Sequence, residues 1–268
     1  MTPPEGPAAR GRLPGGLTLR SMVPNAITAA ALCCGLTGIR FAIAQDWENA
    51  VLAVILAGML DGIDGRIARL LKAQSRFGAE LDSLADNVSF GVAPALILYL
   101  WSLQQLPRLG WFAALAFAIA CALRLARFNA RIDMADEPRK EAGFLTGVPA
   151  PVGAGLVFLP MYLWFVSGLE HLRNPLLVSG WLVAMGFLLI SSVATLSWGK
   201  LRPRKHVRLE GIALAGLLGA ALLTERWWPL VGICAVYLTM LPVGMVMYWR
   251  IKRQRAARPG PLAGPGAA

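Results

Sequence analysis

Charged side chains are scarce in this sequence. Asp, Glu, Lys and Arg make up 15% of the 268 residues, and 56% of the residues are hydrophobic. A soluble domain contains roughly 25% charged residues, so this composition excludes a pair of ordinary soluble domains. No long polar segment separates the apolar runs, which excludes an attached soluble domain. The sequence therefore predicts an all-α polytopic membrane protein whose function resides in its membrane part.

The sequence also lacks the usual signs of a disulfide framework, a zinc site or a nucleic-acid-binding surface. It contains four cysteines, all within apolar runs, and no CxxC pair. The two histidines, His171 and His206, stand alone in predicted loops, and we interpret both as solvated residues. The net charge of +11 comes without a basic stripe that contains interleaved aromatic residues, so we expect no nucleic-acid partner.

Both ends of the chain lack long apolar runs. Residues 1–20 are rich in proline, glycine and arginine, and no apolar core follows a charged start, which argues against a signal peptide. We expect a disordered basic tail there, and a second loose basic tail rich in Pro, Gly and Ala at 251–268. Residues 21–250 are predicted to form a single transmembrane catalytic domain.

Apolar runs of about 20 residues, the length that a transmembrane helix needs, recur along the rest of the chain. We predict about eight spans, at 24–44, 50–71, 79–102, 109–130, 149–168, 175–196, 211–224 and 229–249. This arrangement assigns 22 of the 26 Lys and Arg residues to one side of the membrane. The other side receives Arg40, Arg108, Arg173 and Arg226. Because basic loops stay in the cytoplasm, both termini are predicted to be cytoplasmic.

Acidic residues are few, but they are concentrated in one short region. Five of the fifteen lie between positions 61 and 86, and four of these are Asp61, Asp64, Asp82 and Asp86. On helices, spacings of three and four place each pair on one face, near the cytoplasmic ends of the second and third spans. Four converging carboxylates repel each other unless cations lie between them, and oxygen ligands favour Mg²⁺ or Mn²⁺ over zinc. Two such ions suit phosphoryl transfer.

Glycines are interleaved with these aspartates. Gly62 and Gly65 each follow an aspartate directly, and Gly78 precedes the second pair. A glycine inside a helix is destabilising by roughly 1 kcal/mol relative to alanine, so its presence needs a reason. Close approach of a bulky ligand is one reason and tight helix packing is the other, and we favour the ligand for Gly62 and Gly65. Arg69 lies one turn past Gly65, where its guanidinium can reach a phosphate oxygen.

Two other interpretations of the acidic cluster compete with a metal site. The acids could pair with Arg66, Arg69 and Arg76 in a cytoplasmic loop, although the ordered spacing disfavours this. Aspartates within the membrane could also serve a cation transporter. Against transport, these aspartates lie at span ends and not at the midplane, and the sequence shows no clear internal repeat.

The acidic region resembles a known signature, Asp-x-x-Asp-Gly-x-x-Ala-Arg-x₈-Gly-x-x-x-Asp-x-x-x-Asp, which is that of the CDP-alcohol phosphotransferases. The eight matching positions are Asp61, Asp64, Gly65, Ala68, Arg69, Gly78, Asp82 and Asp86. The resemblance implies a membrane enzyme with a six-helix core, here followed by two C-terminal helices. In such an enzyme an alcohol attacks a CDP-linked substrate and CMP leaves.

Three further segments narrow the resemblance. They are 24–28 at the start of the first span, 124–129 at the end of the fourth and 144–151 at the start of the fifth. This combination is similar to the integral-membrane phosphatidylserine synthases, and it implies CDP-diacylglycerol as donor and L-serine as acceptor. It also implies a homodimer in the bacterial inner membrane with a cytoplasmic active site. The residues alone leave the acceptor open, since glycerol phosphate, inositol phosphate or choline would fit the same chemistry.

The resemblance also implies roles for single residues in binding the donor. Asp61, Asp64 and Asp82 would bind the metal ions, and Asp86 would be both a fourth ligand and the general base. The CDP moiety would contact a set of residues from the first three spans, namely Asn25, Thr28, Asp61, Gly62, Gly65, Ala68, Arg69, Gly78 and Asp82.

The acceptor needs a separate set of contacts. L-serine is a zwitterion, so its carboxylate requires a cationic or hydrogen-bonding partner. Arg124, Arg127 and Asn129 stand at the predicted cytoplasmic end of the fourth span, and they are our candidates for binding serine. The alternative explanation for the two arginines is ordinary anchoring of the span by basic residues.

Overall fold

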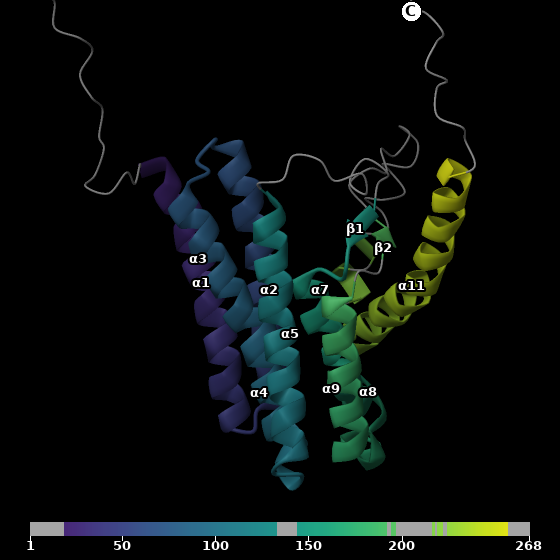
Figure 1. The fold of residues 1–268 in the computed structure, drawn as a ribbon. Helices are drawn as coiled ribbons and strands as arrows, with labels where there is room; N and C mark the ends of the chain where they lie inside the picture. Colours follow the sequence, from purple (N-terminus) through teal and green to yellow (C-terminus); the bar gives the residue numbers. More distant parts are fainter. Residues whose placement is uncertain are drawn as a thin grey trace, which may run out of the picture.

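The protein is a bundle of helices with one very small sheet (Figure 1). The computed structural model describes residues 19–132, 144–191, 194–196, 216–217, 219–221 and 224–256. The predicted all-α membrane class is confirmed. Most of both predicted tails lies outside the described residues, but the last helix continues to Ala256, six residues into the segment that we expected to be loose. That extension is rich in Lys, Arg and Gln, which are good helix formers.

One half of the bundle is built from the first part of the chain. Its elements are α1 (Leu19–Ile43), α2 (Trp47–Leu70), α3 (Arg76–Asp86), the π-helical segment η1 (Asn87–Val92) and α4 (Ala93–Trp101). The helices α1 and α2 form an antiparallel hairpin. Asp46 begins α2 because its carboxylate accepts hydrogen bonds from the backbone N–H and the side-chain amide of Asn49. Ser75 begins α3 in the same way, accepting a bond from the N–H of Gly78.

The elements α3, η1 and α4 follow one another without interruption and form one long rod. The π-helical turn between them starts directly after Asp86, and such turns often occur at functional sites. The rod packs closely on α1, because a Cβ atom on Gly35 would stand only 2.6 Å from Ser89 Oγ. Only a glycine permits this approach, and the contact holds the middle of the rod against the first helix.

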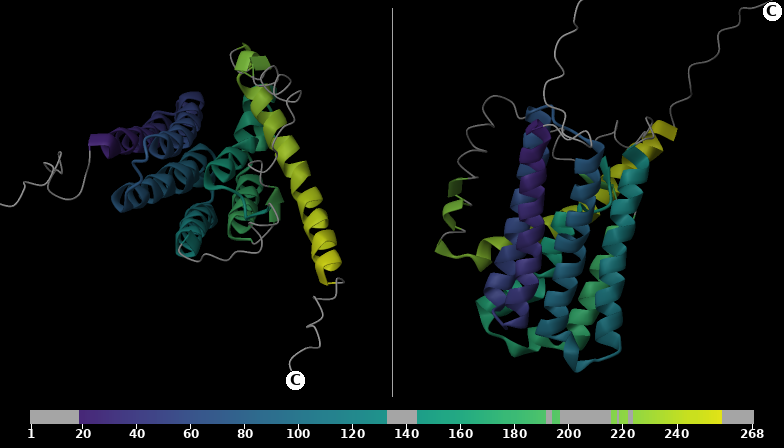
Figure 2. Two further views of the ribbon diagram at one scale, coloured as in Figure 1. Left: turned by 90° about the horizontal axis from the view of Figure 1, so that it is seen from above. Right: turned by 90° about the vertical axis from the view of Figure 1, so that its left-hand side faces the viewer.

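The other half of the bundle contains shorter and more broken elements. They are η2 (Leu103–Gln105), α5 (Leu109–Ile132), β1 (Phe144–Thr146), α7 (Ala150–Val157), α8 (Leu159–Ser167), η3 (Glu170–Arg173), α9 (Pro175–Ile190), β2 (Ala194–Leu196) and α11 (Trp227–Ala256). Strands β1 and β2 pair in antiparallel fashion, with Leu145 opposite Thr195. Pro160 cannot donate a backbone hydrogen bond, which accounts for the break between α7 and α8. Seen from above, α11 runs along one side of the bundle (Figure 2).

Five helical segments among the described residues are long and apolar enough to cross a membrane. They are Met22–Ile43, Arg76–Trp101, Leu109–Ala130, Ala150–Ser167 and Trp227–Gly244. The predicted number of eight spans is not confirmed. The helix α9 is apolar but has only 16 residues. The predicted seventh span, 211–224, lies largely outside the described residues.

The two ends of the bundle differ in composition. The start of α1, the connection from α2 to α3 and the ends of α5 and α11 lie at one end (Figure 1). These are the segments that we predicted to be cytoplasmic. We call this the aspartate end, because α2 and α3 carry their aspartates towards it. The opposite end, where Trp47, Trp101 and Arg173 lie, is called the tryptophan end.

Candidate active site

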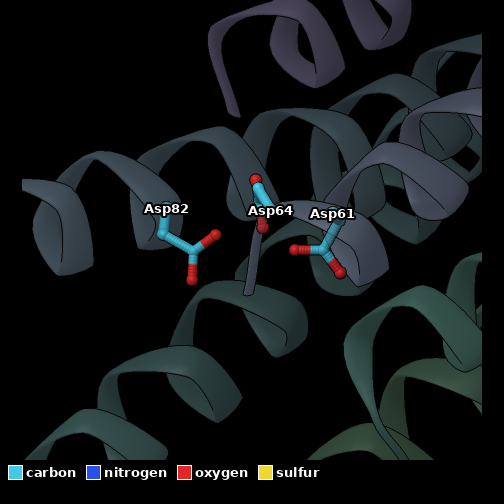
Figure 3. A group of neighbouring side chains, drawn as sticks. All are labelled: Asp61, Asp64 and Asp82. Carbon is cyan, nitrogen blue, oxygen red and sulfur yellow. The ribbon is translucent and has the colours of Figure 1, made fainter. Parts of the chain in front are cut away.

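Three aspartates from two helices converge between α2 and α3. Asp61 and Asp64 lie one turn apart on α2, Asp82 lies on α3, and each offers a carboxylate oxygen within 4.8 Å of the others. Figure 3 shows the three side chains in the same space between the helices. Asp64 is buried, with 4% of its surface exposed, and the other two are half-buried. Gathered carboxylates are costly to bury without a compensating charge, so their oxygens fit a hard divalent cation.

Asp86 adds a fourth carboxyl group to this cluster. It lies one turn after Asp82, and its side chain is hydrogen-bonded to that of Asp61. Two carboxyl groups share a hydrogen bond only when one of them holds a proton. The pair Asp61 and Asp86 can therefore hold a proton at the edge of the cluster.

The part of the chain that the structure describes shows no ion pair that would explain the cluster as an ordinary loop. Among the described residues, none of the four aspartates forms a salt bridge with Arg66, Arg69 or Arg76. Arg66 and Arg76 are exposed. Arg69 donates a hydrogen bond from Nε to the carbonyl oxygen of Gly65 over 2.9 Å. In the described part of the chain, the four acids therefore form no ion pair with these three arginines, and a bound cation could balance their charge.

Thr28 on α1 holds one of the aspartates in place. Its hydroxyl donates a 2.6 Å hydrogen bond to Asp64 Oδ2, and both side chains are buried. The same hydroxyl lies 3.1 Å from the carbonyl oxygen of Pro24, one turn earlier. Partners of this kind orient metal-binding carboxylates and raise metal affinity. Thr28, which we predicted to contact the nucleotide, thus has a direct role in orienting Asp64.

A cavity of about 510 Å³ opens beside the aspartates, between α1, α2 and α3. Seven of the nine residues predicted to bind the CDP moiety line it, together with Asp64. These seven are Asn25, Thr28, Gly65, Ala68, Arg69, Gly78 and Asp82. Asp61 and Gly62 are not part of its wall. The cavity is therefore bounded by the residues that a nucleotide diphosphate would need, namely a carboxylate pair, an arginine and small side chains.

The three glycines of the motif have different surroundings. A Cβ atom on Gly62 or Gly65 would meet nothing within 4 Å, so helix packing does not require a glycine at either position. A Cβ atom on Gly78 would stand 2.9 Å from Asn25 Oδ1, so this glycine permits α3 to approach α1. Packing explains Gly78, and open space next to the helix supports the ligand interpretation of Gly62 and Gly65.

The three serine-binding candidates are held in different ways. Arg127 donates from Nη1 to the carbonyl oxygen of Ile190 at the end of α9. Asn129 donates from Nδ2 to Ser83 Oγ on α3. Both side chains thus tie α5 to a neighbouring helix. Arg124 is half-buried and interacts electrostatically with Asp86, which links it to the aspartate cluster.

An apolar cavity of about 340 Å³ lies on the other side of α2, and sequence reasoning did not anticipate it. Its walls come from α2, α7, α8 and α11, and include Gly58, Met59, Leu230 and Tyr237. Gly58 and Met59 immediately precede the turn that carries Asp61. Long apolar chains fit such a space, and the position places them next to the carboxylates.

Two residues near the site were missed, one because only the polar residues of its segment were considered and the other because no motif contains it. Phe128 lies within the Arg-Leu-Ala-Arg-Phe-Asn segment and lines the cavity beside α3. Tyr237 lies on α11, far from the motif in sequence, and interacts electrostatically with Arg124. The apolar periodicity of α11 gave no reason to single out one tyrosine.

Comparison with known proteins connects this geometry to a family. Residues 21–196 match the family described as CDP-alcohol phosphatidyltransferase. A Mycobacterium leprae protein named CDP-diacylglycerol–serine O-phosphatidyltransferase is 36% identical over 221 residues, which cover 82% of this chain and 73% of that protein. A Mycobacterium tuberculosis protein of the same name is 42% identical over 179 residues, covering 64% of this chain and 60% of that protein. For a Bacillus subtilis protein of this name the identity is 35%, over 64% of this chain and 88% of that protein.

Proposed function

This chain belongs to the CDP-alcohol phosphatidyltransferase family, and on that premise we propose that it is an integral-membrane enzyme that makes phosphatidylserine. It transfers the phosphatidyl group of CDP-diacylglycerol to the hydroxyl of L-serine and releases CMP. The observation that carries the proposal is the convergence of Asp61, Asp64 and Asp82 from α2 and α3 beside a cavity lined by residues of the family signature. The names of the relatives from three organisms support serine as the acceptor.

The aspartates would hold divalent cations. Asp61, Asp64 and Asp82 present oxygens close enough to bind one ion, and Asp86 adds a ligand for a second. Their all-oxygen donor set fits Mg²⁺ or Mn²⁺. When bound, such ions neutralise the pyrophosphate of the donor and the charge that develops on the leaving CMP. Thr28 keeps Asp64 turned towards the cluster through its short hydrogen bond.

The donor would lie across α2. Its nucleotide occupies the cavity between α1, α2 and α3, where the open face of Gly65 admits the diphosphate and Arg69 contacts its oxygens. One of its acyl chains lies in the apolar cavity beside Gly58 and Met59. This arrangement holds the reacting phosphorus next to Asp61 and Asp64, between an aqueous and an apolar site. Catalysis then comes largely from positioning the phosphorus for attack.

Asp86 would serve as the general base. It lies at the edge of the cluster and shares a proton with Asp61, and it would act as a base once bound cations have displaced that proton. As the serine oxygen attacks the phosphorus that bears diacylglycerol, Asp86 accepts the hydroxyl proton. The bond from that phosphorus to the CMP oxygen breaks, and CMP leaves. Arg124 would balance the serine carboxylate from α5.

The location and assembly follow from the same family. We propose that the enzyme lies in the bacterial inner membrane with its active site and both termini in the cytoplasm, as the strong asymmetry of basic residues indicates. We further expect a homodimer, as the resemblance implies.

The test of the function is an acceptor panel. Purified protein is supplied with CDP-diacylglycerol, Mn²⁺ or Mg²⁺, and radiolabelled L-serine, glycerol phosphate, inositol phosphate or choline. We expect CMP and labelled phosphatidylserine with serine, and loss of both when the metal is chelated. CMP release with another alcohol but not with serine would refute the proposed acceptor. Metal-dependent ion flux without CMP from any alcohol would instead indicate a transporter.

A further inference from the structure

Four buried side-chain atoms have no hydrogen-bond partner among the residues that the structure describes. They are Asn87 Oδ1, Trp101 Nε1, Arg124 Nε and Tyr237 Oη. Trp101 lies at the tryptophan end, but the other three come from elements around Asp86. Buried polar atoms are almost always paired, so three unpaired atoms in one region indicate that a bound ligand completes their hydrogen bonds.

The three residues reach this region from three elements. Asn87 directly follows Asp86 and begins η1. Its Oδ1 and the side chain of Cys121 on α5 lie on the same side of Gly91, where a Cβ atom would meet both within 3.3 Å. One turn after Cys121, Arg124 interacts electrostatically with Asp86 and with Tyr237 of α11. Asn87 is therefore the chain neighbour of the proposed base, Arg124 interacts with it electrostatically, and Tyr237 is linked to it through Arg124.

The chemistry of the three atoms is complementary to an amino acid. Asn87 Oδ1 is an acceptor and fits an ammonium group, whereas Arg124 Nε and the Tyr237 hydroxyl donate and fit a carboxylate. A zwitterion with an ammonium and a carboxylate on one carbon, and a hydroxyl on the next, would satisfy all three and direct its hydroxyl to Asp86. A simple alcohol has no carboxylate for Arg124 and Tyr237, and a phosphorylated polyol has no ammonium group for Asn87 Oδ1.

We propose that Asn87 and Tyr237, together with Arg124, bind the ammonium and carboxylate groups of the serine acceptor beside Asp86. This inference rests on the proposed function and extends it, because it assigns acceptor selectivity to specific atoms. Tyr237 lies beyond residues 21–196, the part that matches the family. The last helix thus completes a site whose metal and nucleotide parts come from the family core.

Tyr237 also lines the apolar cavity next to α2. Tyr237 therefore borders the space proposed for a lipid chain as well as the proposed acceptor site. An anionic group at this point could come from the serine carboxylate or from the donor phosphate. The two sources predict different kinetic changes, since loss of the hydroxyl would raise the KM for serine in the first case and the KM for CDP-diacylglycerol in the second.

The experiment compares acceptors that lack one charged group. Ethanolamine is serine without the carboxylate, and 3-hydroxypropionate is serine without the ammonium group. In Tyr237→Phe we expect the KM for serine to rise about tenfold, because a hydrogen bond to a charged group is lost. The ratio of kcat/KM for serine over that for ethanolamine should fall by the same factor. In Asn87→Leu the ratio for serine over 3-hydroxypropionate should fall about tenfold.

Two controls separate these effects from loss of folding or of donor binding. Tyr99→Phe makes the same chemical change near the tryptophan end, where the ring packs against Trp111, and it should leave all ratios unchanged. The KM for CDP-diacylglycerol should stay within twofold of the wild-type value in each variant.

The outcomes distinguish the two proposals. If the wild type uses serine but both variants keep both ratios, the inference is wrong and the proposed function stands. A rise in the KM for CDP-diacylglycerol in Tyr237→Phe, with serine unaffected, assigns the hydroxyl to the donor phosphate and also overturns the inference. If the wild type does not use serine, the proposed function fails and this acceptor site fails with it.

Discussion

The aspartate end and the tryptophan end of the bundle handle polar groups in opposite ways. At the tryptophan end, Arg173 donates from Nε to the carbonyl oxygen of Trp101 and accepts at its own carbonyl from Ser102 Oγ, each over 2.8 Å. Its guanidinium also lies about 6 Å from the ring centres of Trp47, Trp101 and Trp164. The cation is thus enclosed by its own protein, and its charge serves to join three helices.

At the aspartate end the charged groups are gathered but not neutralised. Within the described part of the chain the carboxylates of Asp61, Asp64 and Asp82 have no cationic side chain in an ion pair. Open space adjoins Gly65, and buried polar atoms of Asn87 and Tyr237 lack partners. Trp101 Nε1 is the exception at the other end. The difference teaches that the region built for stability pairs its polar atoms internally, whereas the region built for chemistry leaves them for ligands.

The largest expected effect on catalysis is at Asp86, at the aspartate end. We expect Asp86→Asn to lower kcat by roughly 10²–10⁴-fold, because the general base is lost. The asparagine amide can still donate to Asp61, so the melting temperature should be preserved. The measurement is CMP release with saturating metal, CDP-diacylglycerol and serine. Glu80→Gln on the exposed face of α3 is the matched control. Near-normal CMP release by Asp86→Asn would exclude this residue as the base.

Thr28 tests whether support of Asp64 is part of the metal site. Thr28→Val keeps the shape of the side chain but removes the 2.6 Å hydrogen bond. We expect Mn²⁺ to bind about 10- to 100-fold more weakly, the usual cost of losing such a partner. Titration of bound Mn²⁺ by electron paramagnetic resonance measures this directly. Thr37→Val is the control, since its hydroxyl bonds only to a carbonyl of its own helix. Equal Mn²⁺ affinity in both variants would contradict a supporting role.

Two glycines can be compared to separate space that a ligand fills from space that helix packing requires. In Gly65→Ala the new methyl group meets no protein atom within 4 Å. Stability should therefore hold or rise by roughly 1 kcal/mol, the gain in helix propensity. CDP binding should weaken about tenfold, because the methyl group intrudes on a fitted ligand. Calorimetric titration with CDP and metal provides the measurement.

The partner variant is Gly35→Ala, where the methyl group would lie 2.6 Å from Ser89 Oγ. It should destabilise the protein by about 1–3 kcal/mol, as overpacking does, without altering CDP affinity in the folded fraction. If Gly65→Ala binds CDP as tightly as the wild type, the open face of α2 is not the diphosphate site.

The smallest effect on catalysis is expected at the tryptophan end. Arg173→Ala should lower the free energy of unfolding by about 2 kcal/mol, because it removes a hydrogen bond and the cation–π contacts. The kcat and both KM values should be unchanged at temperatures where the variant is folded. Thermal unfolding in detergent and steady-state assays test the two statements. The exposed Arg108 provides the control Arg108→Ala. A change in KM for serine would show that the two ends are coupled.

Some of this contrast could be predicted from the sequence and some could not. The spacing of Asp61, Asp64, Asp82 and Asp86 predicts their convergence, because helical periodicity is local and the turn between α2 and α3 is short. The bond from Thr28 to Asp64 joins residues 36 positions apart, and it depends on how α1 packs on α2. No local pattern contains that information.

The residues proposed to bind serine also could not be told apart from the sequence alone. Arg124, Arg127 and Asn129 look equivalent in sequence, but Arg127 and Asn129 are hydrogen-bonded to α9 and α3 in the structure. Only the packing of α5 separates them from Arg124. Tyr237 could not be singled out for a similar reason, because its proximity to Arg124 depends on the path of α11 across the bundle.

The π-helical turn at Asn87–Val92 sets the orientation of α3 relative to α4 in the rod formed by α3, η1 and α4. A π turn holds one residue more than an α turn, so it shifts the angular phase of everything that follows. Here the phase shift allows Asp82 and Asp86 to face α2 while Ser89 and Phe90 still point into the bundle, where both are buried. A regular α-helix with the same number of residues would rotate the aspartates by about 100° relative to α4, whereas deleting one residue from η1 would remove the wide turn and keep the two segments in phase. The wide turn therefore positions the aspartates only as long as its extra residue is wound as a π turn.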